Sequence, residues 1–172
     1  MSWTYLSPDR VETSSRSLIP NRVSGIGASA PHSGNSFLAG ASLEVEDGRL
    51  ARIFSEVLGR MDDSVPPIVT LKSISLRRSS RTEGLAGLTR RSARTGAQII
   101  AFYSSVLSNL SDKSCAAVMV HELAHSWLNE HLFPSQSPFR EREADVLARD
   151  WGFRAELDQL AKETENIGGS VY

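Results

Sequence analysis

The stretch from Lys113 to His131, which contains no glycine or proline, limits most strongly what this chain can form. Ser111 and Asp112 precede it as an N-cap and an acidic first turn, so the sequence predicts a helix here. Within the stretch lie His121 and His125. Residues four apart on a helix lie about 40° apart around the axis and about 6 Å along it. Two imidazoles can therefore bind one metal ion from one face of this helix.

Glu122 follows the first of these histidines and projects about 100° further round the predicted helix. Its carboxylate is near enough to reach a water on such a metal, but poorly placed to be a ligand together with both histidines. The pattern predicts a metal site with Glu122 as an adjacent base. The alternative is a helix whose two histidines are satisfied by other partners.

The same helix carries an apolar stripe on the side away from the histidines. The stripe repeats at helical spacing and consists of Ala116, Val120, Leu123 and Trp127. Further apolar residues cover much of the remaining circumference. We therefore expect this helix to lie in the core, with only its histidine face open to a cleft.

A third ligand is expected downstream, because catalytic zinc sites use three protein ligands and keep one position for water. Residues 132–139 contain prolines and serines and indicate a loop, and Arg140–Phe153 indicates a second helix that ends near Gly152. Glu141 and Asp145 share one face of that helix with two alanines, which allow a close approach. This predicts Glu141 as a metal ligand and Asp145 as an acceptor for a histidine N–H. The alternative is a solvated charged face.

The two motifs together, His121-Glu122-x-x-His125 and Glu141-x-x-Ala144-Asp145-x-x-Ala148, resemble the gluzincin clan of zinc metallopeptidases. The pattern is similar to minimal members such as the M48 peptidase domain or the ImmA/IrrE family. The resemblance covers about residues 97–153. It implies three zinc ligands, Glu122 as general base and Asp145 as the partner of a ligand. Unlike the membrane-embedded relatives, this chain has no transmembrane segment evident in its sequence, and no helix-turn-helix region is apparent.

His131 is a competing third ligand, because its spacing from His125 matches that of the metzincin clan. Metzincins turn between these two histidines at a glycine, where this chain has Leu128. A leucine resists the positive φ of such a turn, and the methionine that metzincins place downstream is missing. If the helix continues instead, His131 lies about 9 Å along the axis from His125. This favours Glu141 over His131.

Length and composition indicate one domain and a reducing environment. The chain has 172 residues, a net charge of −1 and one cysteine, so an intrachain disulfide is excluded. Neither a secretory signal nor an apolar stretch of the roughly 20 residues that span a membrane is evident, so a cytoplasmic location without membrane contact is expected. Cys115 is expected to be a buried apolar residue.

Residues 1–42 are rich in Ser, Gly, Pro and Asn and predict a flexible tail before a domain over 43–172. A short segment near Trp3 lying in the cleft as an inhibitory peptide is the alternative. Periodicity within the domain predicts a helix over 44–61, strands over 68–76 and 97–103, and a short turn or helix over 104–110.

A basic cluster lies between the two predicted strands. A solvated hairpin is the favoured interpretation, although these side chains could contact phosphates or acidic protein segments. Aromatic residues are absent from the cluster, so base stacking is not supported. Its members are Arg77, Arg78, Arg81, Arg90, Arg91 and Arg94.

The sequence therefore predicts a small α+β zincin: a short twisted sheet packed on the active-site helix, with C-terminal helices. The expected activity is zinc-dependent peptide hydrolysis. An extended peptide substrate is expected to add as a strand near Ile99–Tyr103. Candidate oxyanion donors are Tyr103, Arg149 and Arg154. Two alternatives stay open: a regulatory or translocated effector protease that cleaves one protein, and a non-catalytic zinc-binding interaction module.

Overall fold

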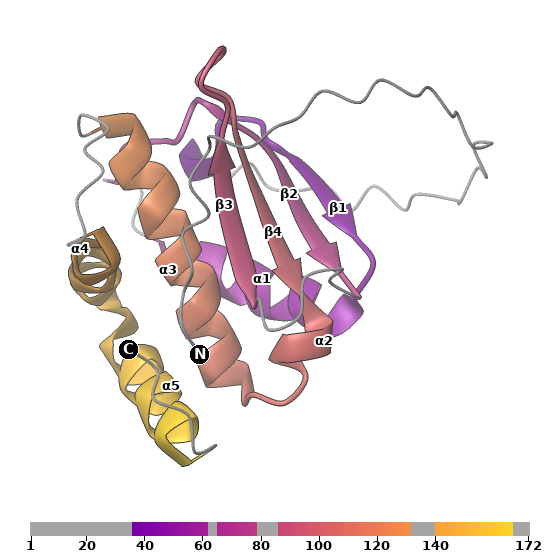
Figure 1. Cartoon of the computed structure of the whole chain (residues 1–172), viewed down its shortest axis with the longest axis vertical. Helices are drawn as coiled ribbons and strands as arrows, with labels where there is room; N and C mark the ends of the chain where they lie inside the picture. The colour runs from indigo at the N-terminus through magenta and orange to yellow at the C-terminus, as the bar shows by residue number, and fades with distance from the viewer. Residues whose placement is uncertain (1–35, 62–64, 79–85, 132–139, 167–172) are drawn as a thin grey trace.

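The computed structural model describes residues 36–61, 65–78, 86–131 and 140–166, and they form a four-stranded mixed sheet with several helices (Figure 1). This is the α+β architecture that the sequence predicts. The predicted tail falls almost wholly in residues 1–35 and the predicted loop in residues 132–139. Both of these ranges lie outside the described residues.

The sheet has the strand order β1-β2-β4-β3. Parallel pairing joins β1 to β2 and β2 to β4, whereas β3 is antiparallel to β4 and forms an edge. The strands are β1 (Ser42–Val45), β2 (Leu71–Arg77), β3 (Gly87–Arg91) and β4 (Gln98–Tyr103). The helices are α1 (Gly48–Arg60), α2 (Ser104–Leu107), α3 (Asp112–His131), α4 (Arg140–Ala148) and α5 (Arg154–Asn166).

The helix predicted over 44–61 corresponds to α1, which begins only at Gly48. The first two residues of the predicted range belong to β1, where Val45 pairs with Leu76. The helix starts later because the Asp47 side chain caps it, accepting a hydrogen bond from the Leu50 backbone N–H at 3.0 Å. The predicted strands over 68–76 and 97–103 are confirmed as β2 and β4, although β2 begins three residues later than predicted, after a turn at residues 69 and 70. Helix α2 lies in the predicted turn or helix over 104–110.

Two other expectations change. Folded structure begins before residue 43, because Phe37 is 2% exposed and its carbonyl accepts a hydrogen bond from the Ile68 N–H at 2.8 Å. The predicted substrate edge at Ile99–Tyr103 is wrong, because β4 lies inside the sheet between β2 and β3. The edge strand on this side is β3, in the segment predicted as a solvated hairpin.

Helix α3 is the centre of the fold. It is buried continuously from Ser114 to Ala124, and it lies between the sheet on one side and α4 and α5 on the other (Figure 1). On the sheet, Phe54 of α1 packs against Phe102 of β4 with ring centroids 6.0 Å apart. The prediction of an α3 that is apolar over much of its circumference is confirmed.

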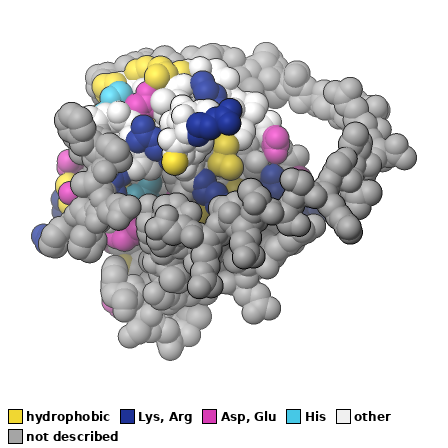
Figure 2. Space-filling view, turned by 45° about the horizontal axis from the view of Figure 1, so that its top comes forward, with side chains coloured by type: hydrophobic (Ala, Val, Ile, Leu, Met, Phe, Trp, Pro, Cys, Tyr) yellow, Lys and Arg dark blue, Asp and Glu magenta, His cyan; other side chains and the backbone are white. Residues whose placement is uncertain are grey.

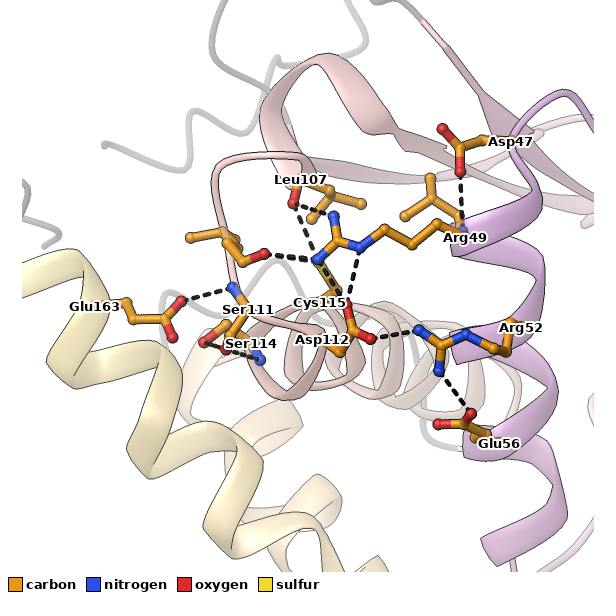
Figure 3. A network of polar contacts seen from close by, with 12 residues as sticks. Asp47, Arg49, Arg52, Glu56, Leu107, Ser111, Asp112, Ser114, Cys115 and Glu163 are labelled. Carbon is orange, nitrogen blue, oxygen red and sulfur yellow. Dashed lines mark hydrogen bonds and ion pairs between the residues drawn. The ribbon is translucent and has the colours of Figure 1, made fainter.

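The beginning of α3 is fixed by a polar network that reaches α1 and α5 (Figure 3). Arg49 of α1 donates from Nε to Asp112 Oδ1 at 2.8 Å and from its two other nitrogens to backbone carbonyls at 3.2 and 2.7 Å. Glu163 of α5 accepts a hydrogen bond from the Ser111 N–H at 3.0 Å. Ser111 itself accepts from the Ser114 N–H, as expected of an N-cap.

The end of α3 is fixed to the turn that precedes β2 by Glu130, whose carboxylate accepts hydrogen bonds from the Val69 and Thr70 N–H groups, both at 3.0 Å. With both ends fixed, the histidine face of α3 has a defined position relative to the sheet. None of the described helices is long and apolar enough to cross a membrane.

Gly152 ends the helical run that begins at Arg140, as the sequence predicts. Its φ of +89° is one that glycine adopts at little cost, and it lies in a π-helical turn (Arg149–Phe153) between α4 and α5. The turn redirects the chain, so that α5 can pack on α3 while α4 approaches the other end of the same helix (Figure 1).

Candidate metal centre

Three potential ligands from α3 and α4 meet at one point. The Nε2 atoms of His121 and His125 lie 2.9 Å apart. Glu141, in the first turn of α4, places Oε2 at 3.1 Å from His121 Nε2 and Oε1 at 3.4 Å from His125 Nε2. Within the described part of the chain, these three residues form a group whose ligand atoms all lie within 4.8 Å of one another.

Small side chains let the two helices approach. Ala144 and Ala148 are the buried residues of α4, and Ala144 packs with Ala124 and Leu128 of α3. An alanine at these positions keeps the helix axes close, so the carboxylate of Glu141 reaches the histidines. This is the arrangement that the spacing in the sequence predicts.

Asp145 lies one turn after Glu141 and accepts a hydrogen bond from His121 Nδ1 at 2.8 Å. This bond leaves Nε2 of the same ring directed at the point where the three ligands meet. Burial disfavours the charged form of His121, but the hydrogen bonds to Asp145 and Glu141 outweigh it and raise its pKa to about 10. Hydrogen bonds from His121 and His125 hold the pKa of Glu141 well below its usual range.

The donor set fits a zinc ion. Two imidazole nitrogens and one carboxylate are among the ligand sets found in zinc hydrolases, and the carboxylate contributes the negative charge. In this structure the same three groups contact one another through hydrogen bonds and ion pairs. A cation would therefore replace a proton that His121 otherwise retains, since zinc binds the neutral imidazole.

Glu122 is 5% exposed and lies between α3 and the edge strand β3. Thr89 Oγ1 donates a hydrogen bond to Glu122 Oε2 at 2.6 Å and lies 3.2 Å from the Glu122 backbone carbonyl oxygen. The negative charge of Glu122 contributes to raising the pKa of His121, so the carboxylate and the histidine interact electrostatically.

Gly87 and Thr89 lie against Glu122, and the sequence does not predict this. The segment that contains them is predicted as a solvated hairpin, because β3 is short and carries no long apolar alternation. The available signal is weak: a glycine followed two residues later by a β-branched threonine, which places both on one face of a strand.

His131 lies apart from this centre. Its Nε2 is 3.2 Å from the Pro67 carbonyl oxygen, and its ring packs on Trp127 with centroids 4.5 Å apart. The helix runs through Leu128 without a turn, as expected if Glu141 is the third ligand. Among the candidate oxyanion donors, Arg149 forms an ion pair with Asp158 at 3.7 Å. The identity of the oxyanion donor stays a prediction.

Several arginines of the basic cluster have partners within the protein. Arg77 lies 3.8 Å from Glu44, Arg78 Nε donates to the Glu46 carbonyl at 2.9 Å, and Arg91 donates to the Asn129 carbonyl at the end of α3. Arg90 and Arg94 are exposed, whereas Arg81 lies outside the described residues. Figure 2 shows several basic side chains on one exposed face, with hydrophobic and acidic side chains near them.

Comparisons of the chain with protein-family models, with curated proteins and with solved structures found no match. The proposal of a function therefore depends on the geometry of this centre and on the chemistry of its residues.

Proposed function

We propose that this protein is a zinc-dependent metallopeptidase of the gluzincin type. His121, His125 and Glu141 are the zinc ligands, Glu122 is the general base, and Asp145 orients His121. The observation that carries the proposal is the convergence of two imidazoles and a carboxylate within 4.8 Å, next to a buried carboxylate that is not one of the ligands.

When bound, a zinc ion supplies a Lewis acid that lowers the pKa of a water toward 7 and polarises a substrate carbonyl. Asp145 accepts the Nδ1 proton of His121, which leaves the Nε2 lone pair for the metal. Glu122 accepts the proton of the attacking water and then delivers it to the leaving amine. Burial of Glu122 keeps bulk water away from this proton transfer.

The substrate is proposed to bind along β3, the edge strand nearest Glu122. Hydrogen bonds from the Tyr103 N–H to Ala86 and from the Ser92 N–H to Ala97 fix which residues of β3 bond to β4. By the alternation of an antiparallel ladder, the backbone groups of Gly87, Thr89 and Arg91 then point away from β4. An extended peptide can pair with these groups, which brings its backbone beside Glu122.

A non-catalytic zinc module is disfavoured, because a structural site has no use for Glu122. A protease that cleaves a single regulatory or host protein shares this chemistry and differs only in its substrate.

A cytoplasmic location is part of the proposal, since the one cysteine, Cys115, fits a reducing compartment. Burial raises the pKa of its thiol to about 11, so it is protected from oxidation.

The test is Glu122→Gln, which removes the proton acceptor and preserves size and polarity. We expect zinc content and fold to be retained and hydrolysis of a peptide mixture to fall by at least about 100-fold. The matched control is Glu165→Gln on the exposed surface of α5, which should leave hydrolysis unchanged. Undiminished turnover by the zinc-loaded Glu122→Gln protein would refute the mechanism.

A further inference from the structure

We infer that Thr89 is a positioning residue for Glu122, and that Gly87 provides the space in which the Glu122 side chain lies. The inference rests on the proposed function and deepens it, because it gives the edge strand β3 a part in holding the general base. It assigns a role to residues outside both sequence motifs.

The contact itself is short and directed. Thr89 Oγ1 lies 2.6 Å from Glu122 Oε2, a distance typical of a hydroxyl that donates to a carboxylate. A hydroxyl has a single proton, so the Glu122 carbonyl oxygen at 3.2 Å is a weaker, secondary acceptor. The bond fixes one carboxylate oxygen and leaves the other available for proton transfer.

Gly87 restricts the same side chain from a second direction. A Cβ at this position would lie 2.8 Å from Glu122 Cγ, closer than non-bonded carbon atoms approach, and 3.1 Å from Oε1, which is a tight contact. Residues 87 and 89 lie two apart on β3, so both face α3. Gly87 thus limits the position of the Glu122 side chain sterically, and Thr89 holds it by a hydrogen bond.

The partners of Glu122 differ from those of carboxylates that serve structure in this chain. Glu130 accepts two backbone N–H groups and the Thr70 hydroxyl, and Glu156 pairs with Arg60 at 2.7 Å. Among the described residues, Glu122 forms no salt bridge with a cation, and its side chain receives one neutral hydroxyl. Such a partner sets the orientation of a base without neutralising its charge.

The first experiment measures kcat and KM of the zinc-loaded protein on a peptide substrate. Thr89→Val keeps the shape and removes the hydroxyl, so we expect kcat to fall about 10- to 100-fold. KM should stay within roughly twofold and zinc content should be unchanged. Thr89→Ser, which keeps the hydroxyl, should restore most of kcat. Thr164→Val, on α5 with its hydroxyl bonded to the Leu160 carbonyl, is the matched control and should not change kcat.

A second experiment separates positioning from a general structural effect. In a Glu122→Gln background no base remains to be positioned, so adding Thr89→Val should cause little further loss. Equal losses in both backgrounds would mean that Thr89 supports the fold instead, and would overturn the inference. A crystal structure of metal-free Thr89→Val should show the Glu122 carboxylate displaced or in several conformers, whereas Thr89→Ser should retain its position.

Gly87→Ala keeps the inference testable if Thr89→Val does not fold. It should displace Glu122 and lower kcat with zinc still bound. Full kcat in Gly87→Ala or in folded Thr89→Val, with an inactive Glu122→Gln protein, would overturn the inference and leave the proposed function standing. A zinc-loaded wild type without hydrolytic activity, or an active Glu122→Gln protein, would overturn both.

Discussion

In the metal-free protein, His121 should remain protonated at pH values well above the ordinary pKa of an imidazole. The free energy of unfolding should therefore fall as the pH rises. The pKa of His121 rises from 6.5 to about 10 on folding, because its hydrogen bonds to Asp145 and Glu141 outweigh the cost of burial. The folded state therefore holds this proton where the unfolded state has lost it. The resulting stabilisation is complete below pH 6.5 and is lost as the pH rises through about 10.

The magnitude follows from the shift and from the exposure of the partners. One pKa unit corresponds to about 1.4 kcal/mol, so the full shift would give at most about 5 kcal/mol. Solvent screens the interaction, since the side chains of Glu141 and Asp145 are 54% and 35% exposed. We therefore expect the unfolding free energy to fall by roughly 2–3 kcal/mol between pH 6.5 and 10.

Urea unfolding in the presence of a chelator, at intervals from pH 6 to 10, measures this slope, and NMR titration of the His121 ring locates the proton. Asp145→Asn and Glu141→Gln should flatten the dependence. His131→Gln should leave it unchanged, because His131 lies outside the cluster. A constant unfolding free energy across this range, or a His121 titration near pH 6.5, would refute the reasoning.

Three further predictions concern the ligands and the fold. Glu141→Ala should lose zinc and activity in metal analysis and peptide assays, whereas His131→Ala should keep both; the opposite pattern would exclude Glu141 as the third ligand. Asp145→Asn should weaken zinc binding about 10- to 100-fold in a chelator competition, because His121 loses its carboxylate partner. Gly152→Ala should destabilise the fold by about 1–2 kcal/mol in thermal unfolding, because alanine resists a φ of +89°. An unchanged melting temperature would contradict that last reasoning.

The sequence predicted the convergence of His121, His125 and Glu141 because each step is local. Two histidines four apart share a helix face by geometry alone, and Glu141 shares its helix face with the alanines that allow a close approach. Their role as zinc ligands stays a prediction. The geometry of Asp145 agrees with its predicted part, since its carboxylate lies 2.8 Å from His121 Nδ1.

The order of the strands could not be predicted in the same way, because strand pairing joins segments far apart in the sequence. An alternating segment such as Gln98–Tyr103 has the same sequence pattern at the edge and in the middle of a sheet. The pattern therefore does not predict its place between β2 and β3. Phe37 was missed for a related reason. A single aromatic residue in a short segment without periodicity gives no sign of burial, although Phe37 is almost fully buried.

The attachment of α4 through alanines has a consequence for how the centre is loaded. Only Ala144 and Ala148 of this helix are buried, so α4 removes little apolar surface from water. Segments with few buried apolar contacts open at the lowest free energy, and we expect backbone amides of α4 to exchange with solvent faster than those of α3. Opening of α4 would carry Glu141 and Asp145 away from the two histidines together. The rate at which a metal ion enters the centre would then depend on the rate at which α4 opens.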